Sequence, residues 1–200
     1  LGPPSEELRH ANIAVHCLGE SNIWTVRPRW RAASQGIWNF AAAQWLERLL
    51  AGQHPPDTVV HLHQWTKAFS PSVLAAVSRS GRPFVVTLHD YFLACPNGAY
   101  FVFPQRRPCT LTPMTAACWS TACDSRSAAH KAVRMLRQLV TGAALPRHGR
   151  PLNVIHVSAH AAEVATPFLP PSTRHWTLPN PVHIEPGPRI PAERNRSIAY

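Results

Sequence analysis

The sequence predicts an α/β fold in which a Rossmann-like parallel sheet carries helices on both faces. Its 200 residues are enough to bury one good core. Hydrophobic residues make up 45% of the chain and charged residues 15%, which is typical of a globular protein and not of a disordered one. Short apolar runs alternate with helical stretches, and this alternation indicates parallel strands with helices packed on both faces.

Five apolar runs rich in β-branched or aromatic residues are predicted strands. They cover residues 12–18, 58–63, 84–88, 152–157 and 174–178. Cys17 lies inside the first of these runs, so we expect its thiol in the core.

The stretches between the strands have helical spacing of apolar residues. They cover about 38–50, 70–78, 127–141 and 159–166. In the second of them, Ser70 followed by Pro71 is the expected order of an N-cap and a first helical residue.

The stretch 127–141 has two contrasting faces. Its predicted buried face is apolar and consists of Ala129, Ala132, Val133, Leu136, Leu139 and Val140. A basic stripe lies opposite and consists of Arg126, His130, Arg134 and Arg137. The stripe would suit an anionic membrane surface or a phosphorylated acceptor, and an ordinary solvated helix face is the alternative.

The chain is predicted to be a fragment that contains one domain and the start of another. It begins at Leu1 without a methionine. Residues 1–180 form the predicted domain, the proline-rich residues 181–196 a linker, and residues 197–200 the first half of a further strand.

The net charge of +10 favours anionic partners such as phosphate-bearing molecules or anionic lipid headgroups. Nucleic acid is not expected, because the sequence has neither a zinc-finger spacing nor an aromatic RNA-binding box. No apolar run approaches the roughly 20 residues that a membrane-spanning helix needs.

Polar residues follow several of the predicted strands at their carboxyl ends. His63, His89, Asp90, Ser158 and Asn180 all occupy such positions. Ligands of parallel sheets bind at this edge, so we expect these residues to converge on one crevice. For His89 and Asp90 two interpretations stay open: they bind sugar hydroxyls, or they cap the sheet and start a turn.

Four further cysteines form a cluster in the loop-rich segment that follows. They are Cys95, Cys109, Cys118 and Cys123. Four thiolates satisfy a structural zinc, although the spacing lacks the usual C-x2-C knuckle. Disulfides and unpaired thiols are the alternatives, and nothing in the sequence indicates an oxidising compartment.

Several common motifs are missing. There is no dinucleotide-binding glycine motif, no Walker A sequence and no G-x-S-x-G serine elbow. Glu185 and Glu193 do stand in an E-x7-E spacing, but intervening prolines forbid the helix start that this nucleotide-sugar signature requires. We interpret this spacing as coincidence.

Five segments together resemble the N-terminal half of bacterial glycosyltransferases of family 4, which have the two-domain GT-B fold. They are "VVHLHQWTKAFSPSVL" (59–74), "TLHDYFLACPNGAYF" (87–101), "CWSTACDSRSAAHKAVRMLRQ" (118–138), "VIHVSAHAAEV" (154–164) and "LPNPV" (178–182). The order and spacing look like those of enzymes that assemble exopolysaccharide or lipopolysaccharide.

The resemblance implies a role for each candidate residue. His89 would face the donor sugar and the reaction centre, and Asp90 would hold the loop. His63 and Trp65 would line the acceptor side, with Asn97 also among the substrate-binding residues. Nearer the donor, Ser158 and Asn180 would lie at the interdomain edge.

The resemblance also implies the chemistry and the partners. Family members are retaining transferases that need no catalytic metal and act on a nucleotide-sugar donor and a glycan or lipid-linked acceptor. The resemblance implies a cytoplasmic protein, and the resemblance and the charge together imply a peripheral position at the inner face of the membrane. The donor is held mainly by a C-terminal domain, so this piece is expected to be inactive alone.

The chain departs from the family pattern at its start, where no glycine-rich loop precedes residue 12. The first strand and that loop are therefore expected to be missing. The alternative function is a zinc-stabilised α/β module that binds a ligand without catalysis.

Overall fold

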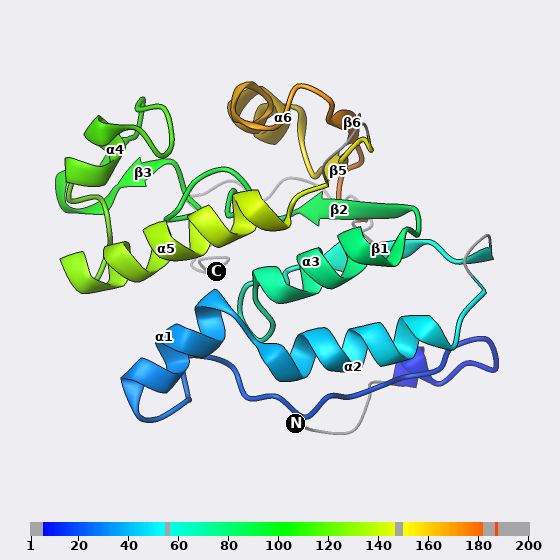
Figure 1. Ribbon diagram of the computed structural model, residues 1–200. Coiled ribbons are helices and arrows are strands. Elements are labelled where there is room, and N and C mark those ends of the chain that lie inside the picture. The colour runs from blue at the N-terminus through cyan, green and yellow to red at the C-terminus, as the bar shows by residue number, and fades with distance from the viewer. Residues whose placement is uncertain (1–5, 55–56, 147–149, 182–186, 188–200) are drawn as a thin grey trace.

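A computed structural model describes residues 6–54, 57–146, 150–181 and 187 of the chain (Figure 1). The predicted linker at 181–196 lies almost wholly outside the described residues, and the predicted strand start at 197–200 lies outside them entirely.

The central feature is a four-stranded parallel sheet with the strand order β1-β2-β5-β6. Its strands are β1 (Val60–His63), β2 (Phe84–Leu88), β5 (Asn153–His156) and β6 (Arg174–Thr177). In register, Val86 of β2 lies between Leu62 of β1 and Val154 of β5. The predicted α/β class with a Rossmann-like parallel sheet is confirmed.

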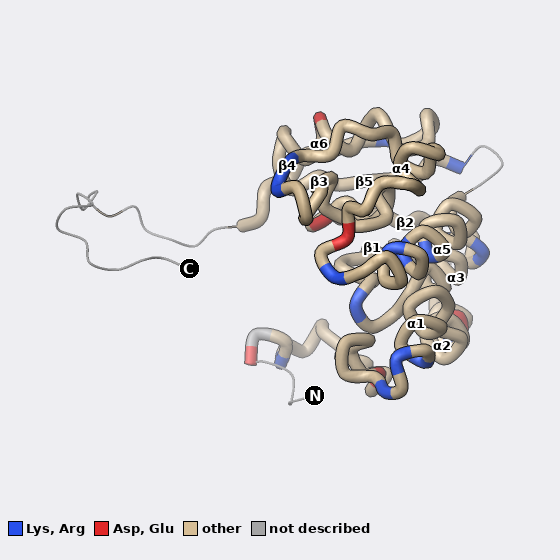
Figure 2. The backbone as a smooth tube through the Cα atoms, turned by 90° about the vertical axis from the view of Figure 1, so that its left-hand side faces the viewer, with Lys and Arg blue, Asp and Glu red and all other residues tan. Residues whose placement is uncertain are grey.

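The main helices are α1 (Arg29–Ile37), α2 (Phe40–Ala51), α3 (Pro71–Ser80), α5 (Ala128–Ala144) and α6 (Ala159–Ala165). Right-handed connections between successive neighbouring strands all return on the same side of the sheet. Residues of α2, α3, α5 and α6 accordingly share one core cluster with β2 and β5. Figure 2 shows α2, α3 and α5 together on one side of β1 and β2. The opposite face carries the exposed side chains of His61, His63 and Trp176. Helices on both faces were predicted, but the described helices that pack on the sheet lie on one face, because every connection returns on the same side.

The connection from β2 to α5 forms a small separate layer beside the sheet. It contains β3 (Phe101–Val102) paired antiparallel with β4 (Arg107–Pro108), and the short helix α4 (Ala116–Ser120). Three 3-10 turns complete the described structure: η1 (Glu6–Leu8), η3 (Phe103–Gln105) and η4 (Thr166–Phe168).

Buried hydroxyl groups join the starts of α2 and α3. Ser70 caps α3 as predicted, and its Oγ accepts the backbone N–H of Ser72 at 3.2 Å. The same Oγ accepts the backbone N–H of Asn39, the N-cap of α2, at 2.8 Å. Ser72 Oγ in turn donates to the carbonyl of Asn39 at 2.7 Å. This network fixes the corner between α1 and α2.

The predicted strand at 12–18 is wrong. The segment has no strand structure, and Ile13, Val15 and Cys17 are exposed, so the thiol of Cys17 is not in the core. Strand propensity is a local property, whereas a strand needs a neighbour that pairs with its backbone. Helix α1 was not predicted, because it begins after Pro28 with the alternating residues Arg29, Trp30 and Arg31 and has no side-chain cap.

The predicted orientation of α5 is also wrong. Leu136 and Leu139 are 48% and 53% exposed, while Lys131, Arg137 and Gln138 are buried. Specific partners make this possible. The ammonium of Lys131 donates to the carbonyl groups of Cys118, Trp119 and Thr121, and Gln138 donates to the carbonyl of Leu93 at 2.9 Å. Hydrogen bonds to carbonyls satisfy Lys131 and Gln138, so the helix can hold these two polar side chains inward.

Candidate functional site

Three histidines form a connected group at the carboxyl end of β1 and β2. His63 Nδ1 lies 3.0 Å from His89 Nε2, and His63 Nε2 lies 3.4 Å from His61 Nδ1. His61 Nε2 is 2.7 Å from the hydroxyl of Thr87. Because β1 and β2 are paired neighbours, the predicted meeting of His63 and His89 occurs. His61 was missed by sequence reasoning. It lies two residues before His63 in β1, so both side chains are on the same exposed face of the sheet.

The electrostatics of this group keep its central ring neutral. Partial desolvation of this largely exposed ring, followed by the neighbouring rings of His61 and His89, lowers the pKa of His63 below its ordinary value of 6.5. A neutral imidazole both donates and accepts hydrogen bonds, so it can bind a hydroxyl group in either role. The histidine group is therefore suited to bind a polyhydroxylated ligand or to transfer a proton.

Asp90 lies directly after His89 and is half-buried. Its carboxylate accepts the backbone N–H of Phe92 at 3.2 Å, a contact that holds the loop after β2. Burial raises the pKa of Asp90, while the Phe92 hydrogen bond and then the guanidinium of Arg137 act in the opposite direction.

Ser158 and Asn180 belong to the other end of the same sheet edge. Ser158 follows β5 and caps α6, where its hydroxyl accepts the N–H of Ala161 at 3.1 Å. Asn180 is exposed beyond β6. Among the described residues, no hydrogen bond joins either side chain to the three histidines. His63 and His89 are thus in contact, whereas the carboxylate of Asp90 accepts the backbone N–H of Phe92. The convergence of all five residues on one crevice stays a prediction.

Trp65 and Asn97, both predicted to bind substrate, are buried. Trp65 is 4% exposed and belongs to the hydrophobic core, so its ring does not line an open acceptor surface as expected. Asn97 is buried; its side chain accepts the N–H of Ala99 at 3.0 Å and donates to the carbonyl of Phe101 at 2.8 Å. Their burial makes them parts of the core and of a loop, and neither faces a ligand in this arrangement.

The four clustered cysteines line one small cavity of about 20 Å³ beside Lys131. All four are free thiols; Cys95, Cys118 and Cys123 are buried and Cys109 is half-buried. Burial raises the pKa of the Cys95 thiol, while backbone N–H groups that face its sulfur, led by that of Tyr100, act in the opposite direction. In the part of the chain that the structure describes, no three His, Cys, Asp or Glu side chains are arranged as metal ligands. The structural zinc stays a prediction.

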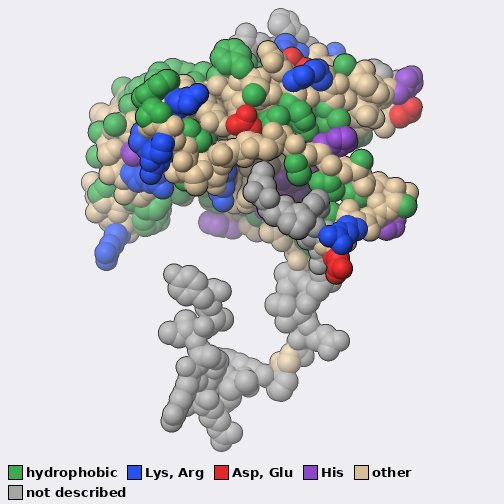
Figure 3. All heavy atoms as spheres, turned by 90° about the horizontal axis from the view of Figure 1, so that it is seen from below, with side chains coloured by type: hydrophobic (Ala, Val, Ile, Leu, Met, Phe, Trp, Pro, Cys, Tyr) green, Lys and Arg blue, Asp and Glu red, His purple; other side chains and the backbone are tan. Residues whose placement is uncertain are grey.

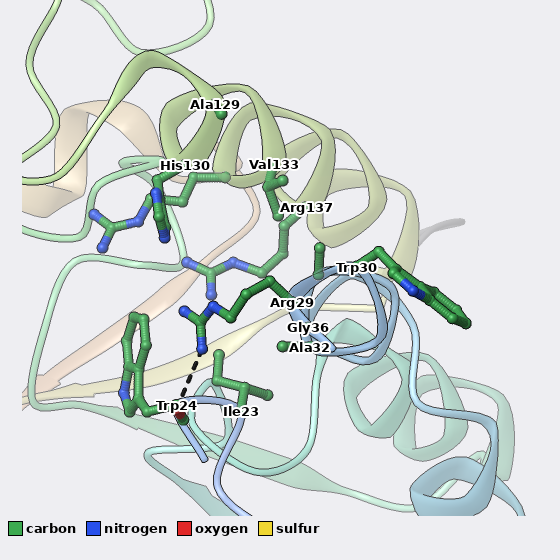
Figure 4. A pocket seen from close by; sticks show the side chains of 12 residues that line it. Ile23, Trp24, Arg29, Trp30, Ala32, Gly36, Ala129, His130, Val133 and Arg137 are labelled. Atoms are coloured by element: carbon green, nitrogen blue, oxygen red, sulfur yellow. Dashed lines mark hydrogen bonds between the residues drawn. The ribbon is translucent and has the colours of Figure 1, made fainter. Parts of the chain in front are cut away.

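A larger pocket lies between α1 and α5 and was not predicted. Its volume is about 330 Å³, and Figure 4 shows its side chains. The pocket is lined by Ile23, Trp24, Arg29, Trp30, Ala32, Ala33, Gly36, Ala129, His130, Val133, Arg134 and Arg137. The basic stripe predicted on 127–141 was the available signal, since three of its four members line this pocket. The other wall could not be foreseen without α1.

The pocket is contiguous with the loop after β2. The guanidinium of Arg137 lies 4.4 Å from the ring centre of Phe92, and that of Arg134 lies 5.8 Å from it. Arg137 also influences the pKa of Asp90, as described above. Phe92, which contacts both arginines, is three residues from His89 of the histidine group.

Comparison with known proteins identifies no relative: no family model, no curated protein and no solved structure matches the chain. Within the described ranges, no helix combines the length and the apolarity needed to cross a bilayer.

Proposed function

We propose that this chain is the acceptor-side domain of a retaining glycosyltransferase with two GT-B domains. The enzyme would transfer a sugar from a nucleotide-sugar donor to a glycan or lipid-linked acceptor during the synthesis of cell-surface polysaccharide. It would act in the cytoplasm, in peripheral contact with the inner face of the membrane. The donor would be held by a domain that follows this one in a longer chain.

The observation that carries the proposal is the pair of His63 and His89, 3.0 Å apart where two neighbouring parallel strands end. This edge is where parallel α/β sheets bind their ligands. The resemblance of the five sequence segments to family 4 supports the same edge as the sugar-binding cleft, because two of those segments contain these histidines.

Each residue would have a distinct part in transfer. His89 would hydrogen-bond a hydroxyl of the donor sugar, and His63 would hold the ring of His89 in place. Asp90 would keep the loop closed beneath the sugar. Stabilisation of the leaving nucleoside diphosphate by the second domain would supply most of the rate, so the domain alone would be inactive.

The test uses the product of the full reading frame, extended past Tyr200. It would be incubated with UDP-glucose, UDP-galactose or GDP-mannose and an organic extract of the native membranes, and nucleoside diphosphate release would be measured. We expect His89→Ala to reduce the rate by about 100-fold or more, as is usual for loss of a group that acts in the transition state. His160→Ala is the control, because His160 lies exposed on α6.

Two results would refute the proposal. One is a reading frame that ends without a second domain. The other is an active full-length enzyme in which His89→Ala and His160→Ala behave alike.

A binding module without catalysis is the second candidate. The gathering of four thiols around one cavity favours it, because a zinc-stabilised module would have such a cluster. It predicts stoichiometric metal and ligand binding with no turnover of any nucleotide sugar.

A further inference from the structure

We infer that the pocket between α1 and α5 binds the phosphate-bearing end of an amphipathic lipid, a phosphoryl or diphosphoryl group on an apolar chain. The inference rests on the proposed function only where it takes this lipid to be the sugar acceptor. Binding itself can be tested without catalysis.

In the part of the chain that the structure describes, Arg137 is a buried cation without a full set of hydrogen-bond partners. Arg137 is 8% exposed, and among the described residues its Nη2 atom is a buried nitrogen with no hydrogen-bond partner. Burying an incompletely paired guanidinium is costly, and a bound anion would offset that cost. A phosphate matches the planar fork of a guanidinium through paired hydrogen bonds.

Neighbouring basic groups strengthen the preference for an anion. Arg29, His130 and Arg134 line the same pocket. Arg134 also forms an ion pair with Asp124, in which its Nη1 lies 3.2 Å from the carboxylate. Burial, and then the nearby charge of Arg134, lowers the pKa of Arg137 to about 10, so Arg137 remains charged at neutral pH. Figure 4 shows Arg29, from α1, and Arg137, from α5, among the side chains that line the pocket, and the guanidinium of Arg29 donates to the carbonyl of Trp24 at 3.2 Å.

The remaining walls of the pocket are apolar. They come from Ile23, Ala32, Ala33, Gly36, Ala129 and Val133. A volume of about 330 Å³ lies within the usual range of small-molecule sites, about 300–1,000 Å³. A free sugar phosphate would leave these walls without a partner, whereas a lipid chain would cover them.

The surface around the pocket exposes large apolar and basic side chains. Trp30 lines the pocket yet is 70% exposed, and Leu136 on α5 is 48% exposed. Figure 4 shows the ring of Trp30 pointing away from the arginines. Arg27, Arg29 and Arg31, at and just before the start of α1, are exposed. Figure 3 shows Lys and Arg side chains next to hydrophobic ones near its left edge. Exposed aromatic and basic side chains together suit the interface of an anionic membrane.

Calorimetric titration of the 200-residue chain tests the pocket. The probe is farnesyl diphosphate below its micelle concentration, compared with inorganic diphosphate and with farnesol. We expect the amphiphile to bind at least about tenfold more tightly than either part alone, because only it uses both the cations and the apolar walls. Equal binding of inorganic diphosphate would overturn the inference.

Variants separate the pocket from general charge. Arg137→Met and Arg29→Gln are expected to weaken binding by about 10- to 100-fold, the usual effect of losing a hydrogen bond to a charged group. Ala129→Leu fills the pocket from an exposed position without changing charge and is expected to weaken binding similarly. Arg48→Gln, which removes one exposed charge on α2, is the matched control. If Arg137→Met does not fold, the other two variants decide.

Vesicles distinguish a pocket from a charged surface. Phosphatidylcholine vesicles containing a small fraction of a long-chain isoprenyl phosphate should bind the chain, and Ala129→Leu should abolish that binding. Two findings together would overturn the inference. They are binding to phosphatidylglycerol vesicles that Ala129→Leu does not change, and no preference for vesicles that contain the isoprenyl phosphate. If the pocket binds the probe but the full-length product uses no nucleotide sugar, the proposed function fails while the pocket stands.

Discussion

Replacement of Ser70 by alanine tests how the corner between α1 and α2 is held. Ser70 Oγ accepts two backbone N–H groups, those of Asn39 and Ser72, and is fully buried. Loss of an N-cap costs about 1 kcal/mol, and leaving the buried N–H of Asn39 unpaired costs about 1–3 kcal/mol more. The free energy of unfolding should therefore fall by about 2–4 kcal/mol.

Thermal unfolding followed by circular dichroism measures this change. For a chain of this size, the expected loss corresponds to a Tm lower by about 5–15 °C. Ser34→Ala is the control, because its exposed hydroxyl only donates to the carbonyl of Arg31 within α1, and it should stay within about 0.5 kcal/mol of the parent. A change for Ser70→Ala as small as that of the control would refute the assigned network.

Three further predictions follow from other parts of the molecule. Burial and the adjacent His175 lower the pKa of His156 below 6.5. As the pH falls, the unfolded chain therefore binds a proton at this histidine before the folded chain does. The free energy of unfolding is retained above pH 6.5 and falls as the pH drops from there toward the lowered pKa. Urea midpoints at about pH 7.5 and about pH 5.5 should differ less in His156→Gln. Cys17 should react with a thiol reagent in the folded chain, whereas the buried thiols of Cys95, Cys118 and Cys123 should react only after unfolding. Release of about one zinc per chain on unfolding would support the metal prediction. Gly98→Ala should cost about 2 kcal/mol or more, because Gly98 has φ +73° and a Cβ there would lie 2.6 Å from the ring of Phe92; an unchanged urea midpoint would contradict it.

Local signals in the sequence were sufficient for much of the fold. The apolar run at 84–88 and the order Ser70-Pro71 lead to the observed β2 and α3, since each depends on short-range patterning and capping. The meeting of His63 and His89 could also be foreseen. Parallel neighbours end at one edge, so residues that close two such strands lie together.

The partners of each element were decided by the tertiary structure alone. The segment 12–18 has strand propensity but no paired neighbour, and Trp65 ends up in the core although its position after β1 suggested an open edge. Helix α5 is the clearest case. Its apolar periodicity predicted a buried face of alanine, valine and leucine side chains. Carbonyl acceptors instead hold Lys131 and Gln138 inside, and Leu136 is exposed.

The sequence by itself therefore determined the fold class, most of the element positions and the edge of the sheet where His63 and His89 meet. It also showed the basic stripe, but not that Arg137 is buried against a pocket. That pocket exists because α1, more than ninety residues earlier in the chain, packs beside α5. Periodicity and capping act over a few residues, whereas burial, pairing and cavities arise from segments that only folding brings together.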